Sequence, residues 1–238
     1  MEIFSFRDFA LQQSAEVFKL GTDTLILGAI GSAFSAKRVL EIGAGTGAVS
    51  LMYAAKNPNS RISAIEIQEL AFKICQSNFQ GSPFTSRLEV IHGAVQEFVP
   101  KTTFDLILSN PPYFKDALPS AAEVKLKARH QVSLDFYDLL RKSAELLSPS
   151  GNACFIIPVE AYGQMKNLAL ESQLFVHELW EVFYKENDAK PHSVVVNLQK
   201  GECGVPKRKV LRVRNSDGGY HAEYAALLSD FLPKQHFQ

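Results

Sequence analysis

Short apolar runs and helical patterns alternate along the chain. The run Leu106–Leu108 ends at a Ser-Asn-Pro break and is too short for a helix, which indicates a buried strand. Residues 133–147 instead carry apolar side chains at the spacing of one helical face, and this pattern stops at Pro149-Ser150-Gly151. Alternating strands and helices with right-handed crossovers predict an α/β fold with a doubly wound sheet.

The same patterns give the boundaries of the expected elements. Strands are predicted at 38–42, 61–67, 88–92, 104–109, 153–157, 175–184 and 193–198, and helices at 25–30, 48–56, 133–147 and 159–171. A further short segment is expected at 95–98. Phe4 and Phe6 alternate as in a strand, which predicts an N-terminal hairpin or lid leading into a helix. We expect one domain over 1–238, divided into the lid and helix (1–35), the core sheet (36–200) and a C-terminal extension (201–238).

The strand at 104–109 runs into Asn110-Pro111-Pro112-Tyr113. Proline cannot donate to a sheet ladder, so the strand must end there, and the two prolines hold the backbone stiff. At the carboxyl end of a parallel strand, the Asn110 side-chain oxygen and the Pro111 carbonyl could accept the two hydrogens of a planar amino group such as that of adenine. Tyr113 could then stack on the base. The competing interpretation is a strand followed by a Pro-Pro turn.

A glycine turn follows the strand at 38–42, in Gly43-Ala44-Gly45-Thr46-Gly47, and a helix begins at Ala48. Glycines permit a tight turn with the backbone pressed against a ligand. Glu66 lies some twenty residues further on, at the tip of the next strand, where a carboxylate can accept from both hydroxyls of a ribose. The pattern predicts a nucleotide site. A dehydrogenase would place a pyrophosphate there, whereas Glu41 just before the turn favours a ligand without phosphate.

The composition of the chain limits the classes of function that it can have, but it does not identify one. The chain has 238 residues, of which 46% are hydrophobic, enough to bury a core, and its 25 basic residues balance its 25 acidic ones. A nucleic acid would therefore be held by local patches. The three cysteines, Cys75, Cys154 and Cys203, lack C-x-x-C spacing, which is typical of core or surface thiols in a reducing compartment. We expect a soluble, cytoplasmic protein without a metal site or membrane segment, and a monomer.

Two short stretches carry the local basic charge. In 205–214 a strand would place Arg208, Arg212 and Arg214 on one face and Leu211 and Val213 on the other. The loop 115–131, long enough to move over the site, carries Lys125, Lys127 and Arg129. The two sets could grip a nucleic acid on either side of the pocket. Alternatively, the arginines keep an edge strand soluble.

The motifs resemble those of known enzymes. Glu41-Ile42-Gly43-Ala44-Gly45-Thr46-Gly47 is similar to motif I of the class I methyltransferases, and Asn110-Pro111-Pro112-Tyr113 resembles the motif of those that methylate amino groups conjugated to a ring or carbonyl. The resemblance implies a Rossmann-like sheet of seven strands, the last one antiparallel, with S-adenosylmethionine as cofactor. The implied catalytic residues are Asn110, Pro111, Pro112 and Tyr113. The implied cofactor contacts are Thr22, Asp23, Glu41, Gly43, Ala44, Gly45, Gly47, Glu66, Ile67, Ala94 and Asn110.

A narrower resemblance extends nearly from end to end. Phe4–Phe9, Lys19–Ala29 and Ala128-Arg129-His130 together look like the bacterial tRNA1(Val) (adenine(37)-N6)-methyltransferase family. It implies methyl transfer to N6 of the adenine beside the anticodon of a valine tRNA. Relatives usually carry an acid after the third strand to hold the cofactor adenine. Here Gly93-Ala94-Val95 offers none, which leaves backbone amides or Gln96 and Glu97.

Other activities use similar residues. A protein glutamine N5-methyltransferase would use the same Asn-Pro-Pro-Tyr geometry, but such enzymes usually have a helical domain before the cofactor fold, and only about forty residues precede Val39 here. The adenine could also belong to rRNA or DNA. A catalytically silent RNA-binding relative would not need Glu66, Asn110 and Tyr113. His192, where a basic residue is common, is interpreted as a turn residue rather than a base.

Overall fold

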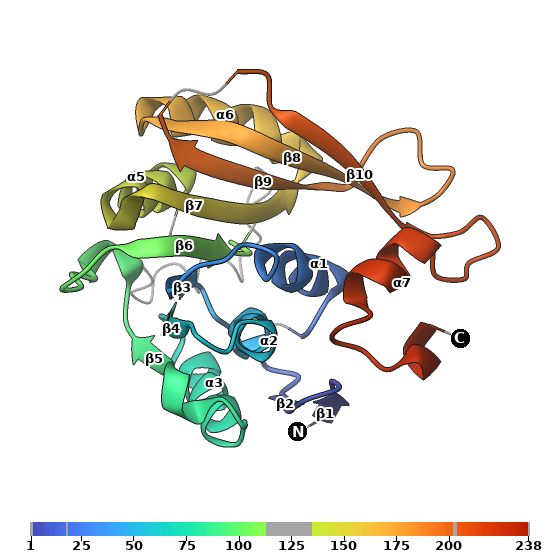
Figure 1. The fold of residues 1–238 in the computed structure, drawn as a ribbon, viewed down its shortest axis with the longest axis horizontal. Helices are drawn as coiled ribbons and strands as arrows, with labels where there is room; N and C mark the ends of the chain where they lie inside the picture. Colours follow the sequence, from blue (N-terminus) through green and yellow to red (C-terminus); the bar gives the residue numbers. More distant parts are fainter. Residues whose placement is uncertain (1, 18, 113–134, 202–203, 238) are drawn as a thin grey trace, which may run out of the picture.

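A mixed sheet is built from the apolar runs of the sequence (Figure 1). The computed structural model describes residues 2–17, 19–112, 135–201 and 204–237. Within these ranges eight strands pair in the order β10-β8-β9-β7-β6-β3-β4-β5. Their bounds are β3 Arg38–Ile42, β4 Arg61–Glu66, β5 Leu88–His92, β6 Phe104–Ser109, β7 Leu147–Pro158, β8 Leu174–Lys185, β9 Ser193–Lys200 and β10 Lys207–Arg214.

The strand directions confirm the predicted class of fold. Strands β3 to β7 pair in parallel, and β9 is antiparallel to both β7 and β8. The seventh strand of the core is therefore the antiparallel one, as expected. In the described residues the sheet has one strand more than the seven predicted, because β10 from the C-terminal extension pairs in parallel with β8.

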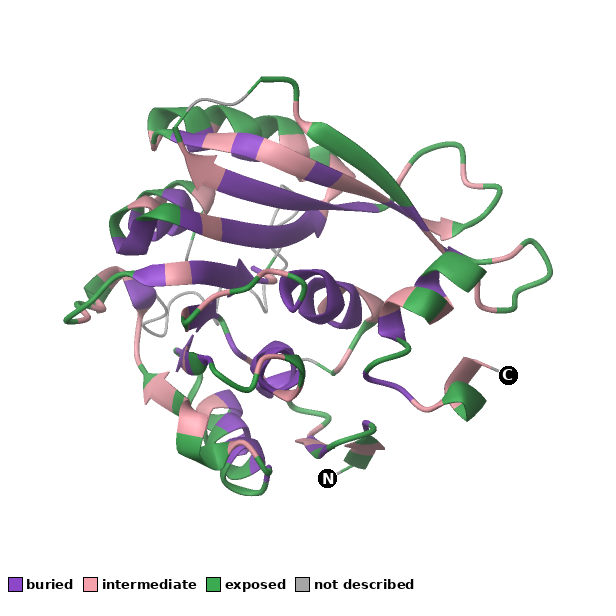
Figure 2. Cartoon of the chain, in the orientation of Figure 1, coloured by how far each residue is buried: buried purple, intermediate pink, exposed green. Residues whose placement is uncertain are grey.

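Helices cover both faces of the sheet, which is why its central strands are buried on both sides. Alternate residues of one strand belong to different core clusters, for example Leu106 and Leu108 to one and Ile107 to the other. The first cluster includes residues of α1 (Thr22–Gly31), α2 (Ala48–Lys56), α3 (Glu69–Gln80) and α7 (Ala222–Leu228). The second includes α5 (Phe136–Leu146) and α6 (Tyr162–Glu171). Figure 2 shows buried residues concentrated in the central strands and in α1 and α2.

Several predicted boundaries are wrong. The strand predicted at 153–157 is longer: β7 begins at Leu147, directly after α5, because its first residue pairs with Phe104 and the following residues bulge before Asn152 meets Leu106. β4 ends at Glu66 instead of 67. Short 3₁₀ turns occur at η1 (Thr85–Arg87), η2 (Val95–Glu97), η3 (Val159–Ala161) and η4 (Lys234–Phe237). Of these, η2 corresponds to the predicted short segment, and η3 begins the helix predicted at 159–171.

The first helix begins earlier than predicted, and two helices were not predicted. α1 begins at Thr22 with Gly21 as its N-cap and without a side-chain cap hydrogen bond, so Asp23 and Thr24 lie inside its first turn. α3 buries Ala71, Ile74, Cys75, Asn78 and Phe79, which recur every three to four residues along one face. The helical signal at 69–80 was therefore present in the sequence. The short α7 lies in the C-terminal extension.

The N-terminal hairpin is confirmed. β1 (Glu2–Ser5) and β2 (Ala10–Gln13) pair antiparallel. Asn78 of α3 joins this hairpin to the glycine turn, because its side chain accepts from the Gln12 backbone N–H at 2.8 Å and donates to the Thr46 carbonyl at 2.9 Å. The Arg7 N–H donates to the Phe231 carbonyl at 2.8 Å, so the hairpin also contacts the C-terminal segment.

Candidate active site

The carboxyl ends of the parallel strands bring the predicted site together. The glycine turn follows β3, Glu66 ends β4, Ala94 lies two residues after β5, and Asn110 follows β6. Because β3 lies between β4 and β6, the turn is flanked by Glu66 on one side and Asn110 on the other. This is the edge at which open α/β sheets bind ligands.

The three glycines of the turn have different surroundings. All three have positive φ, at 73° for Gly43, 54° for Gly45 and 80° for Gly47, a region that other residues enter at a cost. A Cβ added to Gly43 or Gly45 would meet no atom within 4 Å. A Cβ on Gly47 would instead lie 2.6 Å from Phe79 and 2.7 Å from Cys75. The first two glycines therefore border open space, whereas the third lets α2 pack against α3.

Glu66 ties β4 to the glycine turn. Its Oε2 accepts from the Gly45 N–H at 2.8 Å, and its Oε1 accepts from the Gln68 N–H at 2.8 Å. The residue is 7% exposed. A carboxylate has about four acceptor positions, so two backbone hydrogen bonds leave capacity for further donors such as ribose hydroxyls.

Glu41 lies beneath the turn. Its Oε2 accepts from the backbone N–H of Ser50, in the first turn of α2, at 2.9 Å, and from the Ser50 hydroxyl. Burial raises the pKa of this carboxyl to about 8, and the nearby Glu66 adds to the effect. Because the raised pKa keeps the Glu41 carboxyl protonated at neutral pH, the negative charge beside the turn comes from the Glu66 carboxylate, which disfavours a pyrophosphate. A direct cofactor contact by Glu41 stays a prediction.

Asn110 is half-buried and lies beside the first turn of α1. Its Nδ2 donates to the Thr24 hydroxyl at 3.3 Å. The end of β6 is fixed by Ser109, whose hydroxyl donates to the Ile42 carbonyl of β3 at 2.7 Å. Pro111 is buried and Pro112 is exposed. Tyr113 lies outside the described residues.

Asp23 and Thr22, two of the predicted cofactor contacts, face other elements of the fold, and Asp23 accepts structural hydrogen bonds. The Asp23 Oδ1 accepts from the Tyr184 hydroxyl of β8 at 2.7 Å and from the Ser193 hydroxyl of β9 at 3.0 Å. Burial and the neighbouring Asp23 raise the pKa of Tyr184, so its phenol stays protonated and donates. The Thr22 side chain lies close to the Tyr224 side chain of α7. The Asp23 carboxylate thus faces two strands instead of its own helix.

Sequence reasoning missed Thr24, Tyr184 and Ser193 as parts of this site. They come from α1, β8 and β9, and no local motif marks them as partners of Asn110 and Asp23. His192 lies in the turn before β9, as interpreted, and its ring stacks on Tyr184 with centroids 4.9 Å apart. Ile67 is 39% exposed just beyond Glu66, and Ala94 is half-buried before η2.

The predicted substrate-binding arginines line one face of β10, at the edge of the sheet. Arg208 pairs with Glu181 and Arg212 with Glu223, each at 3.5 Å. Arg214 donates to the Gly218 carbonyl at 2.8 Å and lies over the Tyr220 ring. These contacts fit an edge strand protected by charge, so phosphate binding by the arginines stays a prediction. The other three basic residues, Lys125, Lys127 and Arg129, lie outside the described residues.

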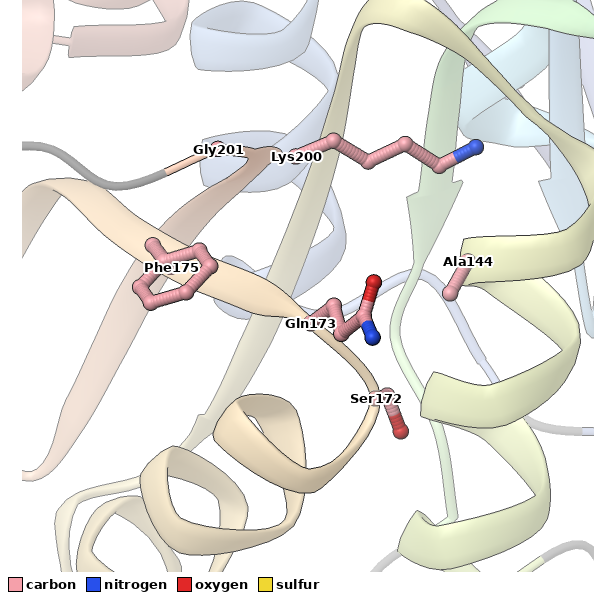
Figure 3. A pocket seen from close by; sticks show the side chains of 6 residues that line it. All are labelled: Ala144, Ser172, Gln173, Phe175, Lys200 and Gly201. Atoms are coloured by element: carbon pink, nitrogen blue, oxygen red, sulfur yellow. The ribbon is translucent and has the colours of Figure 1, made fainter.

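A cavity of about 470 Å³ lies away from the glycine turn and Asn110. It lies at the end of the sheet where β8 begins and β9 ends, opposite the glycine turn. Its lining residues, shown in Figure 3, are Ala144, Ser172, Gln173, Phe175, Lys200 and Gly201. The cavity contains none of the predicted site residues.

The described residues also bear on metal binding and on membrane insertion. In the part of the chain that the structure describes, no three His, Cys, Asp or Glu side chains cluster as metal ligands would. Among the same residues no helix has both the length and the apolar character needed to cross a membrane.

Known proteins resemble the chain in sequence and in fold. Residues 14–158 match the family model "Methyltransferase small domain". The tRNA1(Val) (adenine(37)-N6)-methyltransferases of Flavobacteriaceae bacterium (strain 3519-10) and Dyadobacter fermentans are 34% and 36% identical, and each alignment covers 97% of this chain and 98% or 97% of the relative. The structure of a predicted O-methyltransferase from Agrobacterium tumefaciens superposes with a TM-score of 0.66 at 15% identity, covering 87% of this chain and 95% of that one.

Proposed function

The chain belongs to the methyltransferase small domain family and to the tRNA1(Val) (adenine(37)-N6)-methyltransferases, and from this premise we propose that it methylates N6 of adenine 37 in tRNA1(Val). The methyl donor would be S-adenosylmethionine. The observation that carries the proposal is the placement of Asn110, after β6, next to the glycine turn after β3. With a tRNA substrate, the reaction would take place in the cytoplasm.

The residues present fit this cofactor. Gly43 and Gly45 border open space on the site side of the turn, so a ligand can approach the backbone closely. Glu66, at the tip of the neighbouring strand, has acceptor capacity for ribose hydroxyls. When bound, S-adenosylmethionine supplies a methyl group on a positively charged sulfur. The Glu66 carboxylate beside the turn suits that charge.

Asn110 would activate the target amino group. The adenine N6 lone pair is delocalised into the ring, which makes the amine a poor nucleophile. The Asn110 Oδ1 and the Pro111 carbonyl could accept its two hydrogens, favour a pyramidal nitrogen and so free the lone pair. The Thr24 contact and the buried Pro111 hold these acceptors in position before the substrate arrives. Tyr113 would stack on the base, and an unpaired anticodon-loop adenine costs least to flip into such a site.

The alternatives fit less well. A protein glutamine N5-methyltransferase could use the same acceptors, but the similar curated relatives are named for tRNA over almost their whole length. An NAD-dependent enzyme would need donors for a pyrophosphate, whereas the Glu66 carboxylate presents acceptor oxygens beside the turn.

The test is to incubate the purified chain with bulk tRNA and methyl-labelled S-adenosylmethionine, and then to digest the tRNA and separate its nucleosides. We expect the label in N6-methyladenosine. Label in another nucleoside would refute the target, and stabilisation by NAD without stabilisation by S-adenosylmethionine would refute the cofactor. A ligand at a hundredfold its dissociation constant stabilises the folded state by about 2.7 kcal/mol, which a melting curve detects.

A further inference from the structure

The ring of His192 is held in one orientation in the turn between β8 and β9. It stacks on the Tyr184 ring, with the centroids 4.9 Å apart and an angle of 14° between the planes. Its Nε2 lies 3.3 Å from Oδ2 of Asp188, an oxygen that also accepts from the Lys185 backbone N–H at 2.8 Å. The His192 N–H donates to the Val182 carbonyl at 2.8 Å. Backbone, ring edge and one ring face are therefore all fixed by the folded chain.

The other face of this ring borders solvent. The His192 side chain is 56% exposed, although Tyr184 covers one of its faces and Asp188 lies close to its Nε2. Tyr184 is itself held by Asp23 of α1, which accepts from the tyrosine hydroxyl at 2.7 Å. The stacked pair thus presents a flat and rigid aromatic surface, which can take a further planar ring without losing conformational freedom.

His192 lies at the same edge of the sheet as Asn110. Because β9 is antiparallel to β7, the start of β9 lies where the parallel strands end, and Asn110 follows one of those ends. β7 separates β9 from β6, so the two positions are about 10 Å apart across the sheet. Asp23, which holds Tyr184, is followed in α1 by Thr24, which contacts Asn110. A base on His192 would therefore be a neighbour of the target base, not the target itself.

Exposed cations adjoin this aromatic surface. Lys185 ends β8 and Arg214 ends β10, and the two residues are register partners at the same edge of the sheet. Figure 1 shows the loops after β8 and after β10 extending from the same end of the sheet. Lys190, two residues before His192, is 76% exposed, and its surface ion pair with Glu160 is of a kind that contributes little, so a phosphate can compete for the ammonium group.

The two acidic residues of the same turn already accept backbone hydrogen bonds. Glu186 accepts from the Ser216 N–H at 3.1 Å, and Asp188 accepts from the Lys185 N–H at 2.8 Å. These donors reduce the negative potential that the two carboxylates present to a phosphate. A flat ring beside exposed cations matches single-stranded nucleic acid, whose bases stack on aromatic side chains and whose backbone is anionic.

We propose that the His192 ring stacks on an unpaired RNA base next to the target adenine, an inference that rests on the proposed function. Proteins that recognise RNA loops stack splayed bases on aromatic side chains, histidine among them. Stacking of the neighbouring base stabilises the opened loop while the target adenine is turned out toward Asn110. Because Asp188 lies at Nε2, the ring offers the RNA its face. His192 is thus a substrate-binding residue that acts on affinity for RNA.

The test measures steady-state methylation of a tRNA1(Val) transcript by the full chain and three variants. His192→Ala removes the ring, His192→Phe keeps a ring for stacking, and the control His177→Ala removes a histidine near the start of β8, at the opposite edge of the sheet. We expect His192→Ala to raise KM for the transcript about tenfold at unchanged kcat. His192→Phe and His177→Ala should keep KM within about twofold of wild type.

Calorimetric titration with S-adenosylhomocysteine provides the second readout. All four proteins should bind it with equal affinity, which also shows that each variant is folded. An unchanged KM in His192→Ala would overturn the inference. So would an equal rise of KM in His192→Ala and His192→Phe, because it would assign the effect to a ring nitrogen instead of stacking.

Transcripts that lack one base identify the stacked nucleotide. An abasic nucleotide is placed directly before or directly after the target adenine. For one of these positions the wild-type KM should rise about tenfold, and His192→Ala should show no further loss with that transcript. Losses that multiply at both positions would overturn the inference. Failure of the wild-type chain to methylate the intact transcript while it binds S-adenosylhomocysteine would instead overturn the proposed function, so the two failures are distinguishable.

Discussion

The two sides of the candidate site are assembled over different distances along the chain. On the cofactor side, defined as the glycine turn 43–47 with Glu41 and Glu66, the hydrogen bonds join residues 9 and 21 positions apart. On the target side, defined as Asn110 with residues 22–24 of α1, they join residues 86, 161 and 170 positions apart. The cofactor side is thus a local structure, whereas the target side requires three distant segments.

The difference has a functional consequence. The glycine turn and Glu66 lie at strand ends that form once β3 and β4 pair, so we expect cofactor binding to need one half of the sheet. The position of Asn110 depends on α1, and α1 is held by Asp23 to β8 and β9 in the other half. Changes on the target side should therefore alter methyl transfer or global stability while leaving cofactor affinity intact.

The largest expected effect is on the cofactor side. The pKa of Glu41 is raised to about 8 in the folded chain from 4.5. The folded state therefore keeps a proton that the unfolded state loses, and the resulting stability declines as pH rises from about 4.5 to 8. Glu41→Gln removes this titration. Its free energy of unfolding relative to wild type should rise with pH over that window, by roughly 4 kcal/mol in total.

Urea unfolding of the ligand-free proteins at several pH values measures this difference. A constant gap between the two proteins from pH 5 to 8 would mean that Glu41 is ionised in the folded state.

The Asn110→Ala substitution should slow methyl transfer without changing cofactor affinity. Loss of a preorganised acceptor should lower single-turnover methyl transfer by about a hundredfold or more. The affinity for S-adenosylhomocysteine should change little, because the side chain contacts Thr24 on the target side. Rapid-quench kinetics and calorimetry give the two quantities. Unchanged turnover would remove Asn110 from catalysis.

A pair of glycine variants tests the cofactor side alone. Gly47→Ala places a Cβ against Phe79 and Cys75 at positive φ, so it should lower the free energy of unfolding by about 3 kcal/mol. Gly45→Ala meets no protein atom and should cost about 1 kcal/mol of backbone strain. Its main effect should be at least tenfold weaker cofactor binding. A Gly45→Ala chain with wild-type affinity would place the ligand away from the turn.

Asp23→Ala removes the tie between α1 and the strands β8 and β9. It should lower the free energy of unfolding by about 2 kcal/mol, because two donors lose a carboxylate acceptor. Tyr184→Phe should lower it by about 1 kcal/mol, and a double-mutant cycle should show that the two effects are not additive. If Asp23→Ala instead weakened cofactor binding at unchanged stability, Asp23 would be a cofactor contact, as the sequence resemblance implied.

The smallest effects concern the edge strand. Each Ala substitution of Arg208, Arg212 and Arg214 should change stability by less than about 0.5 kcal/mol, since exposed ion pairs contribute little. If the arginines contact phosphates, each substitution should also reduce the salt slope of tRNA binding by about one. Arg214 lies at the carboxyl end of β10, about 20 Å along the strand from Arg208, so its effect on binding should be the larger. A triple variant with unchanged affinity and salt slope would assign the arginines to protection of the edge.

The contrast between local and distant contacts explains what the sequence could predict. Strands β3, β5 and β6 and helix α2 have the predicted bounds because each is a local apolar pattern with a clear stop. β7 begins six residues before the predicted strand because pairing with β6 determines its first residues, which local pattern cannot show. α3 was missed although its apolar spacing was visible.

The candidate site shows the same contrast between residues that local motifs reveal and residues whose partners lie far away in the sequence. The glycine turn, Glu66 and Asn110 could be placed from short motifs and the rule that ligands bind at the carboxyl edge. The partners of Asp23 could not, because Tyr184 and Ser193 lie in strands whose neighbours depend on the whole sheet.

The most direct measurement of the central claim uses two transcripts of tRNA1(Val), one with adenine at position 37 and one with guanine. Each is incubated with the chain and S-adenosylmethionine, digested and analysed by mass spectrometry. The proposed function predicts about one N6-methyladenosine per molecule in the adenine transcript and none in the guanine transcript. Equal methylation of both transcripts, or of neither under conditions where the chain binds S-adenosylmethionine, would contradict it.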